Sequence, residues 1–400
     1  MAASAITALS AFVIQWAVGR FSSAEVTAEF LVYWALLFAI FGVVGGVRNE
    51  TTRAVGAARS LAAADRSSRA VTAALLLGGV SALLVTASAP LWSERLAPST
   101  SPGIIPVVGL AALSYACHVT LLGALAGTES WRRFSALMIA ESLVRLLLVA
   151  TVLLTAGGLM ALELAVAASA LTWLLLSGSS AFRRALTART DVPLGTLLRN
   201  HLYVIVSSMA SAALVVGFPV LMQLTSREAD ATILASTIFA ITLTRSPIMI
   251  PLQAFQGYAI VAFLRAGRNQ LAALIRPLVI LSACALVAAV AAALLGPWLM
   301  EVLFAGRYEV TSGTFAGLMA AAATLAMLTL TGTAALARSA HLGYTAGWVV
   351  AAAVAAGLLW LPLPLPERTV IALVAGPLAG LAVHLLSVVR GPGRIQTPSE

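Results

Sequence analysis

Arg245 is the residue of this chain best suited to binding an anion, because it lies halfway along an apolar run at 231–262. An arginine at the centre of a bilayer costs roughly 2.5–3.5 kcal/mol on insertion scales, so it normally faces a cavity, a partner or the protein interior. At 100° per residue, Thr242, Gln253 and Gln256 fall on the same side of the helix as the arginine. The pattern predicts a polar stripe lining a cavity, in which the planar guanidinium group binds a pair of phosphate oxygens.

Two prolines close to Arg245 leave a structural role open for the same side chain. Pro247 and Pro251 lie in the same apolar run, which is too long for one simple span. A proline removes one backbone hydrogen bond and clashes with the carbonyl group of the preceding turn, so we expect the run to be broken or kinked within the membrane. In this alternative, Arg245 binds the carbonyl groups that the prolines leave free.

Other polar residues lie where the head group of a lipid would enter from the cytoplasm or cross the membrane. Arg48 and Asn49 follow the second apolar run, and Arg48 is the candidate for a second phosphate contact. The simpler role of Arg48 is that of an anchor on the cytoplasmic side. Asn49, Gln15, Ser207 and Gln223 are uncharged candidates for the lining of a cavity, and hydrogen bonding between helices is the alternative for the last three.

Three charged or titratable residues inside apolar runs are candidates for coupling to protons or to the membrane potential. Glu141 and Arg145 are one helical turn apart, so they could neutralise each other as a purely structural pair. His118 could titrate near neutral pH, with a hydrogen-bonded core histidine as the alternative. Glu163 lies within a turn of the outer end of its run, so we expect it to reach water.

Several kinds of chemistry have no sequence signal. The chain contains no GxxxxGK[ST] phosphate loop, no HExxH, no zinc-spaced Cys/His cluster and no GxSxG elbow. Cys117 and Cys284 both lie inside apolar runs, so neither a disulfide framework nor a CxxC site is available. We therefore expect no metal, no cofactor and no enzymatic activity.

The composition requires a membrane as the main solvent. Of the 400 residues, 60% are hydrophobic and only 10% are charged, whereas soluble domains carry roughly 25% charged residues. The mean hydropathy is +0.99, and most polar residues fall between apolar runs of roughly 20 residues, the length that crosses a bilayer core. The net charge of +9 forms no basic domain that would bind nucleic acid. The chain is thus predicted to be an all-α polytopic protein of the bacterial inner (plasma) membrane.

The elements that must position these residues are about twelve transmembrane helices. Most arginines outside the apolar runs lie in the gaps after even-numbered helices or in the C-terminal tail, which predicts that both termini are cytoplasmic. The helices are expected at 3–18, 30–47, 70–92, 104–126, 134–156, 159–177, 201–224, 231–262, 271–300, 312–337, 342–363 and 369–389.

A long polar gap and an internal repeat predict two lobes of six helices. Ala89–Leu96 at the end of the third helix resembles Gly296–Leu303 at the end of the ninth. Six helices separate the two copies, so the copies share one orientation and form a parallel repeat with a pseudo-twofold axis along the membrane normal. The predicted parts are an N-terminal lobe at 1–178, a cytoplasmic linker at 179–199, a C-terminal lobe at 200–390 and a cytoplasmic tail at 391–400.

Three segments resemble the polysaccharide flippases of the multidrug/oligosaccharidyl-lipid/polysaccharide exporter superfamily. Val47–Val55 is similar to the exit of helix two in that family, Gly127–Phe134 to the loop before helix five, and Glu301–Tyr308 to the exit of helix nine. The resemblance implies two six-helix lobes that open alternately to either side of the bilayer. It also implies that a polyprenyl-linked sugar is flipped from the cytoplasm to the exterior.

The leading hypothesis is therefore a flippase for a polyprenyl phosphate- or pyrophosphate-linked saccharide, with membrane lipids and glycan-assembly enzymes as further partners. A cation-coupled multidrug or metabolite exporter of the same superfamily is the alternative, but it needs a buried acid, and Glu141 has Arg145 beside it. A membrane glycosyltransferase would need a large outer loop with an acidic residue, and only Glu25 and Glu29 in a short first outer loop offer such a pair. A membrane scaffold is the last alternative.

Overall fold

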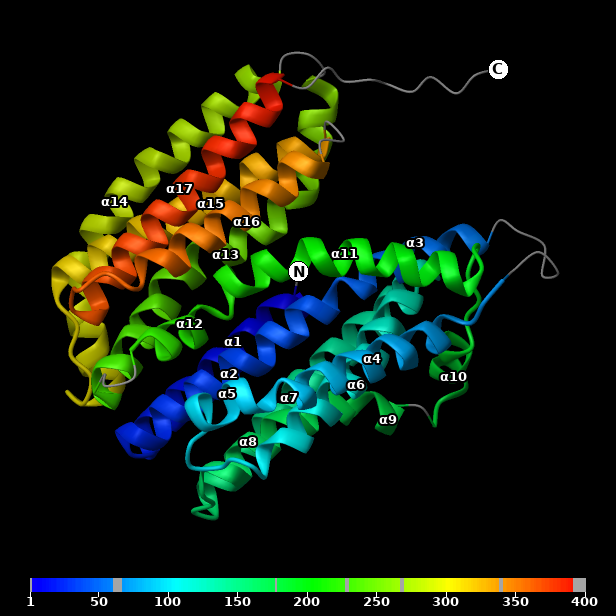
Figure 1. Cartoon of the computed structure of the whole chain (residues 1–400), viewed down its shortest axis with the longest axis horizontal. Coiled ribbons are helices and arrows are strands. Elements are labelled where there is room, and N and C mark those ends of the chain that lie inside the picture. Colours follow the sequence, from blue (N-terminus) through cyan, green and yellow to red (C-terminus); the bar gives the residue numbers. More distant parts are fainter. Residues whose placement is uncertain are drawn as a thin grey trace. The chain divides into compact units, whose positions relative to one another are not determined.

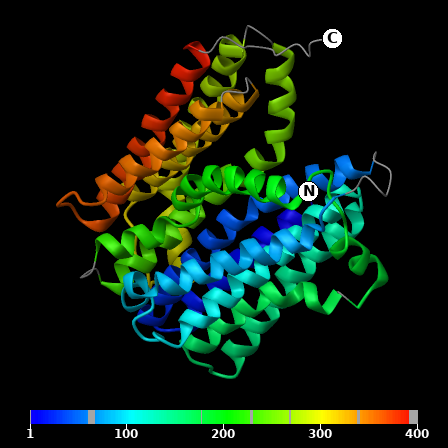
Figure 2. The ribbon, with the colours of Figure 1, turned by 45° about the vertical axis from the view of Figure 1, so that its right-hand side comes forward.

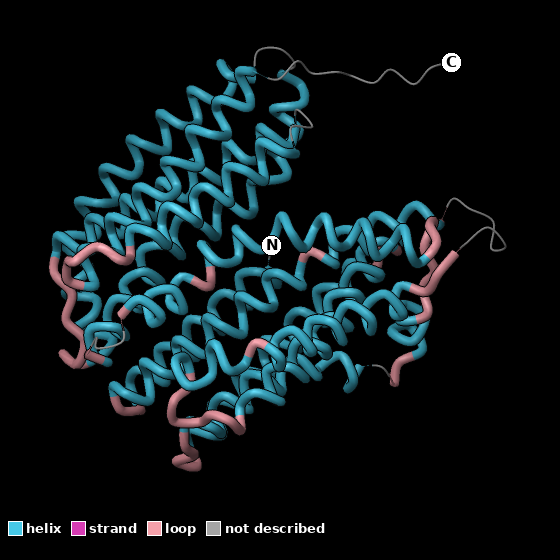
Figure 3. Tube along the Cα trace, viewed as in Figure 1, coloured by secondary structure: helices cyan, strands magenta, loops and turns pink. Residues whose placement is uncertain are grey.

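A computed structural model of the chain describes residues 2–59, 67–176, 178–226, 230–266, 270–337 and 341–390. These residues are nearly all helical, and Figure 3 shows helices joined by short loops. Within the described ranges, β-structure is limited to an isolated antiparallel bridge between Arg69 and Arg189. The predicted all-α class is confirmed.

The chain forms two compact units, Met1–Arg227 and Glu228–Glu400. In unit 1, α6 lies at the centre and packs against α2, α3, α4 and α8. In unit 2, α15 packs against α13, α14, α16 and α17, and Figures 1 and 2 both show these helices side by side. Each unit therefore buries its own central helix.

The helices of unit 1 are α1 (Ala2–Phe21), α2 (Ala24–Gly45), α3 (Val47–Ala58), α4 (Ala70–Ala87), α5 (Ala89–Leu96), α6 (Ile104–Gly127), α7 (Trp131–Leu154), α8 (Leu159–Ala168), η2 (Ser169–Leu171), α9 (Thr172–Leu176), α10 (Ser180–Leu186), α11 (Leu194–Val215) and α12 (Phe218–Thr225). Those of unit 2 are α13 (Ala231–Ala266), α14 (Gln270–Phe304), α15 (Ser312–Ala337), α16 (His341–Leu358) and α17 (Leu365–Arg390). Every predicted apolar run coincides with one of these helices or with two or three consecutive ones.

In the described part of the chain, nine helices are long and apolar enough to cross a membrane. Ser208–Val215 and Phe218–Thr225 form a further apolar pair that is bent by 68°. Leu159–Leu175 and Leu342–Leu358 are shorter apolar helices. The chain is thus a multi-pass membrane protein, while the number of twelve spans stays a prediction.

The most apolar of these helices is α14, whose stretch Leu274–Phe304 reaches a mean hydropathy of 2.8 over its best window. No residue of that window is buried inside the protein. Large side chains such as Leu286, Val287 and Leu294 are exposed along it. In a membrane, this surface faces the acyl chains of lipids.

The first outer connection is shorter than the sequence suggested, because α2 begins at Ala24. Ser23 caps the helix by accepting a hydrogen bond from the backbone nitrogen of Val26, and Glu25 lies in the first turn, where a negative charge favours helix formation. Glu25 and Glu29, expected in a loop, are therefore helical.

The segment after the second apolar run is a helix as well. α3 packs closely against α6, where two glycines leave room for its backbone. A Cβ atom at Gly123 would lie 2.7 Å from the carbonyl oxygen of Arg48, and one at Gly127 would lie 2.8 Å from that of Thr52. Small residues allow such close approach of helices. Arg48 and Asn49 thus lie in the first turn of a packed helix.

The predicted break at the prolines does not divide the long run into two helices, because α13 continues from Ala231 to Ala266. Near the first proline, the Ser246 hydroxyl group donates to the carbonyl oxygen of Thr242, at 2.8 Å. This carbonyl group lies one residue before that of Leu243, which Pro247 leaves without its usual backbone donor.

The boundary between the compact units falls after the predicted linker. α11 and α12 follow the linker, but they pack against α2, α3, α4 and α5, so they belong to unit 1. The contacts between helices determine to which unit each helix belongs, and the order of apolar runs in the sequence does not reveal these contacts. The pseudo-twofold symmetry between the predicted lobes at 1–178 and 200–390 stays a prediction.

We expect reporter fusions to confirm the predicted orientation. Alkaline phosphatase should be inactive when fused after Arg133 and active when fused after Arg95, because arginine-rich loops stay in the cytoplasm. Enzyme activity in intact cells measures the location. The reverse pattern would show that the arginine distribution does not set the topology.

Candidate functional site

A buried ion pair lies inside unit 1. On α7, Arg145 Nη2 donates to Glu141 Oε1, and the two residues are only 3% and 7% exposed. The Ser169 hydroxyl group donates to the same carboxylate oxygen, at 3.3 Å. Buried charges need such partners because the low-dielectric interior does not solvate them. The structure thus joins the two residues that sequence spacing placed one turn apart.

A row of aromatic rings extends from this ion pair. The Arg145 guanidinium carbon lies 4.7 Å from the ring centroid of Phe38 and 5.6 Å from that of Trp34, within the range of cation–π attraction. On α6, the ring of Tyr115 stacks on Phe41, with centroids 3.9 Å apart. We call the row the aromatic ladder; its members are Trp34, Phe38, Phe41, Tyr115 and His118.

His118 lies at the far end of the aromatic ladder from Trp34. Its ring is nearly parallel to that of Tyr115, with centroids 5.6 Å apart, and the residue is 2% exposed. Its Nδ1 has no hydrogen-bond partner within the described residues. The structure therefore places all three coupling candidates, Glu141, Arg145 and His118, around one aromatic row. Their role in coupling stays a prediction.

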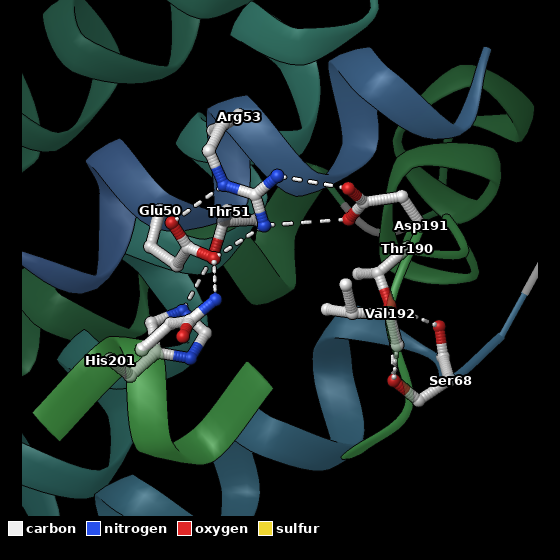
Figure 4. A network of polar contacts seen from close by, with 9 residues as sticks. Glu50, Thr51, Arg53, Ser68, Thr190, Asp191, Val192 and His201 are labelled. Atoms are coloured by element: carbon white, nitrogen blue, oxygen red, sulfur yellow. Dashed lines mark hydrogen bonds and ion pairs between the residues drawn. The ribbon is translucent and has the colours of Figure 1, made fainter. Parts of the chain in front are cut away.

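A second polar cluster fastens the linker to α3, and Figure 4 shows it. Arg53 donates from Nε to Glu50 Oε2 at 2.9 Å and from Nη2 to Glu50 Oε1 at 2.6 Å. Its Nη1 donates to Asp191 Oδ2, at 2.9 Å. The Arg53 side chain is 47% exposed, so its ion pairs remain in contact with solvent. The pair of Glu141 and Arg145, in contrast, is buried.

The same cluster holds the start of α11. Asn200 Nδ2 donates to Glu50 Oε1 at 2.9 Å, and Thr51 Oγ1 lies 3.3 Å from His201 Nε2. We call these residues the α3 network; its members are Glu50, Thr51, Arg53, Asp191, Asn200 and His201 (Figure 4). It joins α3 to the linker and to the helix that follows it.

Backbone bonds reinforce the attachment of the linker. Ser67 N donates to the Thr190 carbonyl at 2.8 Å, and Thr190 N donates to the Ser68 carbonyl at 2.9 Å. The Ser68 hydroxyl group donates to the Val192 carbonyl, at 3.1 Å. The contact of Asp191 with Arg53 was not predicted from the sequence. The available signal was that it is the only acid in the arginine-rich gap between 178 and 200.

The other predicted site residues are scattered over both units. In unit 1, Arg48 is half-buried, Asn49 is exposed and Gln15 is buried. Gln223 Nε2 donates to the Arg95 carbonyl at 3.3 Å, so it joins α12 to α5. For Gln223, this contact matches the alternative of hydrogen bonding between helices.

On α13 of unit 2, Arg245 is partly buried. The Thr242 hydroxyl group donates to the Ile238 carbonyl of the same helix, at 3.0 Å. Gln253 and Gln256 belong to α13 and Ser207 belongs to α11, but their side chains lie outside the described residues. The predicted polar stripe therefore stays a prediction.

The expectation that Glu163 reaches water was wrong. This residue of α8 is 0% exposed. Proximity to a helix end did not reveal that α2, α6 and α7 all pack against α8. Unit 1 thus contains a third buried acid besides Glu50 and Glu141, and Glu163 is the most deeply buried of the three.

We expect the α3 network to protect the linker from proteolysis. Replacing Arg53 with glutamine removes the bonds to Glu50 and Asp191, and partly exposed bonds of this kind contribute about 0.5–1 kcal/mol. Trypsin cleavage after Arg189 should accelerate about two- to fivefold, if cleavage follows the population of the open form. Gel electrophoresis of timed digests measures this rate.

The matched control is Arg59→Gln, which removes an exposed ion pair to Glu129, 3.0 Å apart, at the C-terminal end of α3. Its cleavage rate at Arg189 should equal that of the wild type. Equal acceleration in both variants would mean that the α3 network does not hold the linker.

Two mycobacterial proteins are similar to the whole chain. Uncharacterized protein Rv3630 of Mycobacterium tuberculosis (strain H37Rv) is 36% identical over 395 residues, which cover 97% of this chain and 90% of the relative. Uncharacterized protein Rv1510 of the same strain is 36% identical over 393 residues, covering 98% of this chain and 91% of the relative. No protein-family model matches the chain.

Solved structures share the fold at low sequence identity. An inward-facing multidrug resistance MATE family transporter of the MOP superfamily aligns with a TM-score of 0.71 and 14% identity, over 96% of this chain and 94% of that one. An outward-facing structure of such a transporter aligns with a TM-score of 0.65 and 14% identity, over 96% and 93%.

A MOP superfamily transporter from Pyrococcus furiosus aligns with a TM-score of 0.61 and 16% identity, over 97% of this chain and 93% of that one; the reverse polarity of its binding pocket suggests a different function. The chain therefore belongs to one family with the mycobacterial proteins Rv3630 and Rv1510, and its fold is that of the MATE transporters of the MOP superfamily.

Proposed function

We propose that this protein is an alternating-access flippase of the bacterial plasma membrane. Its substrate is a polyprenyl phosphate- or pyrophosphate-linked saccharide, which moves from the cytoplasmic to the outer leaflet. The fold supports a transporter, because it is shared with MATE structures in inward-facing and outward-facing conformations. Enzymes that assemble the glycan are the expected partners.

The observation that carries the choice of substrate is Arg245 in α13. This helix contains two arginines, Arg245 and Arg265, and no aspartate or glutamate. Its stretch Ala231–Met249 is apolar enough to cross a membrane. A phosphate group crossing a low-dielectric region needs a compensating cation, because an unpaired buried charge is very costly. A substrate that carries a cation would be repelled by the same side chain.

A cation-coupled exporter is a second candidate, and one observation favours it. Such a pump needs a buried acid, and Glu163 is completely buried at one end of α8. The fold of MATE transporters fits this function as well as it fits a flippase. The two candidates differ in the charge of the substrate, so a transport assay separates them.

The test compares two substrates in vesicles that contain the purified protein. One is a polyprenyl phosphate-linked sugar with a fluorescent label that a membrane-impermeant reductant quenches only in the outer leaflet. The other is a cationic dye. We expect protein-dependent movement of the lipid and none of the dye. Accumulation of the dye without movement of the lipid would overturn the flippase in favour of the exporter.

A further inference from the structure

Glu163 combines complete burial with carboxyl oxygens that make no hydrogen bond among the described residues. It lies in the second turn of α8 and is 0% exposed. Neither of its carboxyl oxygens makes a hydrogen bond to any described residue. An ionised carboxylate in such a place is costly, because neither water nor a cation compensates its charge.

The helices around Glu163 supply no cation at its level. On α2, the phenol of Tyr33 donates to the backbone carbonyl of Glu163 at 3.1 Å, and Glu29 lies one turn away from Tyr33. The first eleven residues of α6, 104–114, and the last nine of α7, 146–154, contain no charged side chain. Arg145 of α7 is bound to Glu141. The charged side chain that acts on Glu163 is therefore another acid, Glu29.

The loop between α5 and α6 covers the site. Thr100 lies beside the Glu163 carboxyl group, and its own hydroxyl group is buried. The neighbouring Ser99 donates to Glu29 twice, from its backbone nitrogen at 2.8 Å and from its hydroxyl group at 2.6 Å. Glu29 is partly exposed. Glu29 thus holds the loop from the solvent side, and Glu163 lies beneath the loop.

We propose that Glu163 is a proton-binding site that is opened and closed by the loop at 97–103. With the loop closed, the carboxyl group holds a proton and is neutral. When the loop leaves Glu29, the proton passes to water or to the freed Glu29 carboxylate, and the Glu163 carboxylate is solvated. The coupling of this step to substrate movement rests on the proposed transport function, because a proton exchanged here would drive the conformational cycle.

Infrared spectroscopy tests the site without any transported substrate. The full protein in lipid nanodiscs should show the carbonyl absorption of a buried protonated carboxyl group near neutral pH. Exchange into D2O shifts this absorption. We expect the band in the wild type, its loss in Glu163→Gln and its retention in Glu94→Gln, an exposed acid on α5. An unchanged band in Glu163→Gln would overturn the proposal.

Sodium is the main competing ligand for a carboxylate. If sodium chloride abolished the band at constant pH where potassium chloride did not, the site would be a sodium site and the proposal would fail. A folding defect in Glu163→Gln is detected by size-exclusion chromatography. In that event Glu29→Gln supplies the second test, because it releases the loop and should accelerate D2O exchange of the band severalfold. Unchanged exchange in Glu29→Gln would contradict the gating by the loop.

Transport measurements then separate this inference from the proposed function. An imposed pH gradient should accelerate flipping by the wild type and by Glu94→Gln but not by Glu163→Gln. Equal acceleration of all three would show that proton binding at Glu163 is not coupled to flipping. A band that depends on Glu163 in a protein that moves no lipid would support the proton site and overturn the flippase.

Discussion

Replacement of Arg245 by alanine is expected to abolish the flipping of a phosphate-bearing lipid while the protein remains folded and inserted. Removing one partner of a buried, hydrogen-bonded charge pair costs about 2–5 kcal/mol, which corresponds to a rate lower by about 30-fold to several thousandfold. Arg245→Lys keeps the charge but loses the planar pair of donors, so partial activity is expected. The measurement is the initial rate of flipping in vesicles with equal amounts of inserted protein.

Arg276→Ala is the matched control, because Arg276 is an exposed arginine on the neighbouring helix α14. This variant should flip the lipid at the wild-type rate. If Arg245→Ala did so too, Arg245 would have no contact with the substrate. The alternative of a guanidinium group that binds backbone carbonyls near Pro247 would then remain.

Replacement of Arg145 by alanine is expected to have the largest effect on stability. It leaves Glu141 buried without its cation, which costs about 3–5 kcal/mol for an ion pair inside a protein. It also removes the cation from the rings of Phe38 and Trp34. The midpoint of thermal unfolding in detergent should fall sharply, and replacing both charges with apolar residues, Glu141→Leu with Arg145→Met, should restore most of it.

The charge-swapped variant, Glu141→Arg with Arg145→Glu, distinguishes the pair from its surroundings. If only mutual neutralisation mattered, the swap would be as stable as the wild type. The ring contacts predict an intermediate stability, about 1–2 kcal/mol below the wild type, because a cation at 141 loses its place over Phe38. Normal abundance and stability without transport would instead show that one of the two charges has a functional partner.

The helices were predictable wherever an apolar run ends at polar residues. The runs expected at 104–126 and 312–337 correspond to α6 (Ile104–Gly127) and α15 (Ser312–Ala337). A bilayer imposes a length and a hydrophobicity on each span, and both can be recognised in one sequence. The pair Glu141–Arg145 was predictable for a similar reason, since a spacing of four residues determines the contact on a helix.

The contacts between distant segments were not predictable. Arg53 and Asp191 are separated by 138 residues, and only the packing of the linker on α3 brings them together. Glu163 was misplaced because sequence position gives the depth of a residue in the membrane but not the side that its helix presents to its neighbours. The polar stripe on α13 rests on helical projection, and the described residues neither confirm nor contradict it.

The exposed stretch of α14 makes membrane thickness part of the energetics of this protein. The 24 residues at 277–300, between Arg276 and Glu301, would extend about 36 Å as a straight helix, whereas the hydrocarbon core is about 30 Å thick. Tilting, bending at Pro277 and Pro297 or local deformation of the bilayer must absorb the difference, and each has a modest cost per ångström. A change in the acyl-chain length of the surrounding lipids therefore changes the free energy of α14 in the membrane.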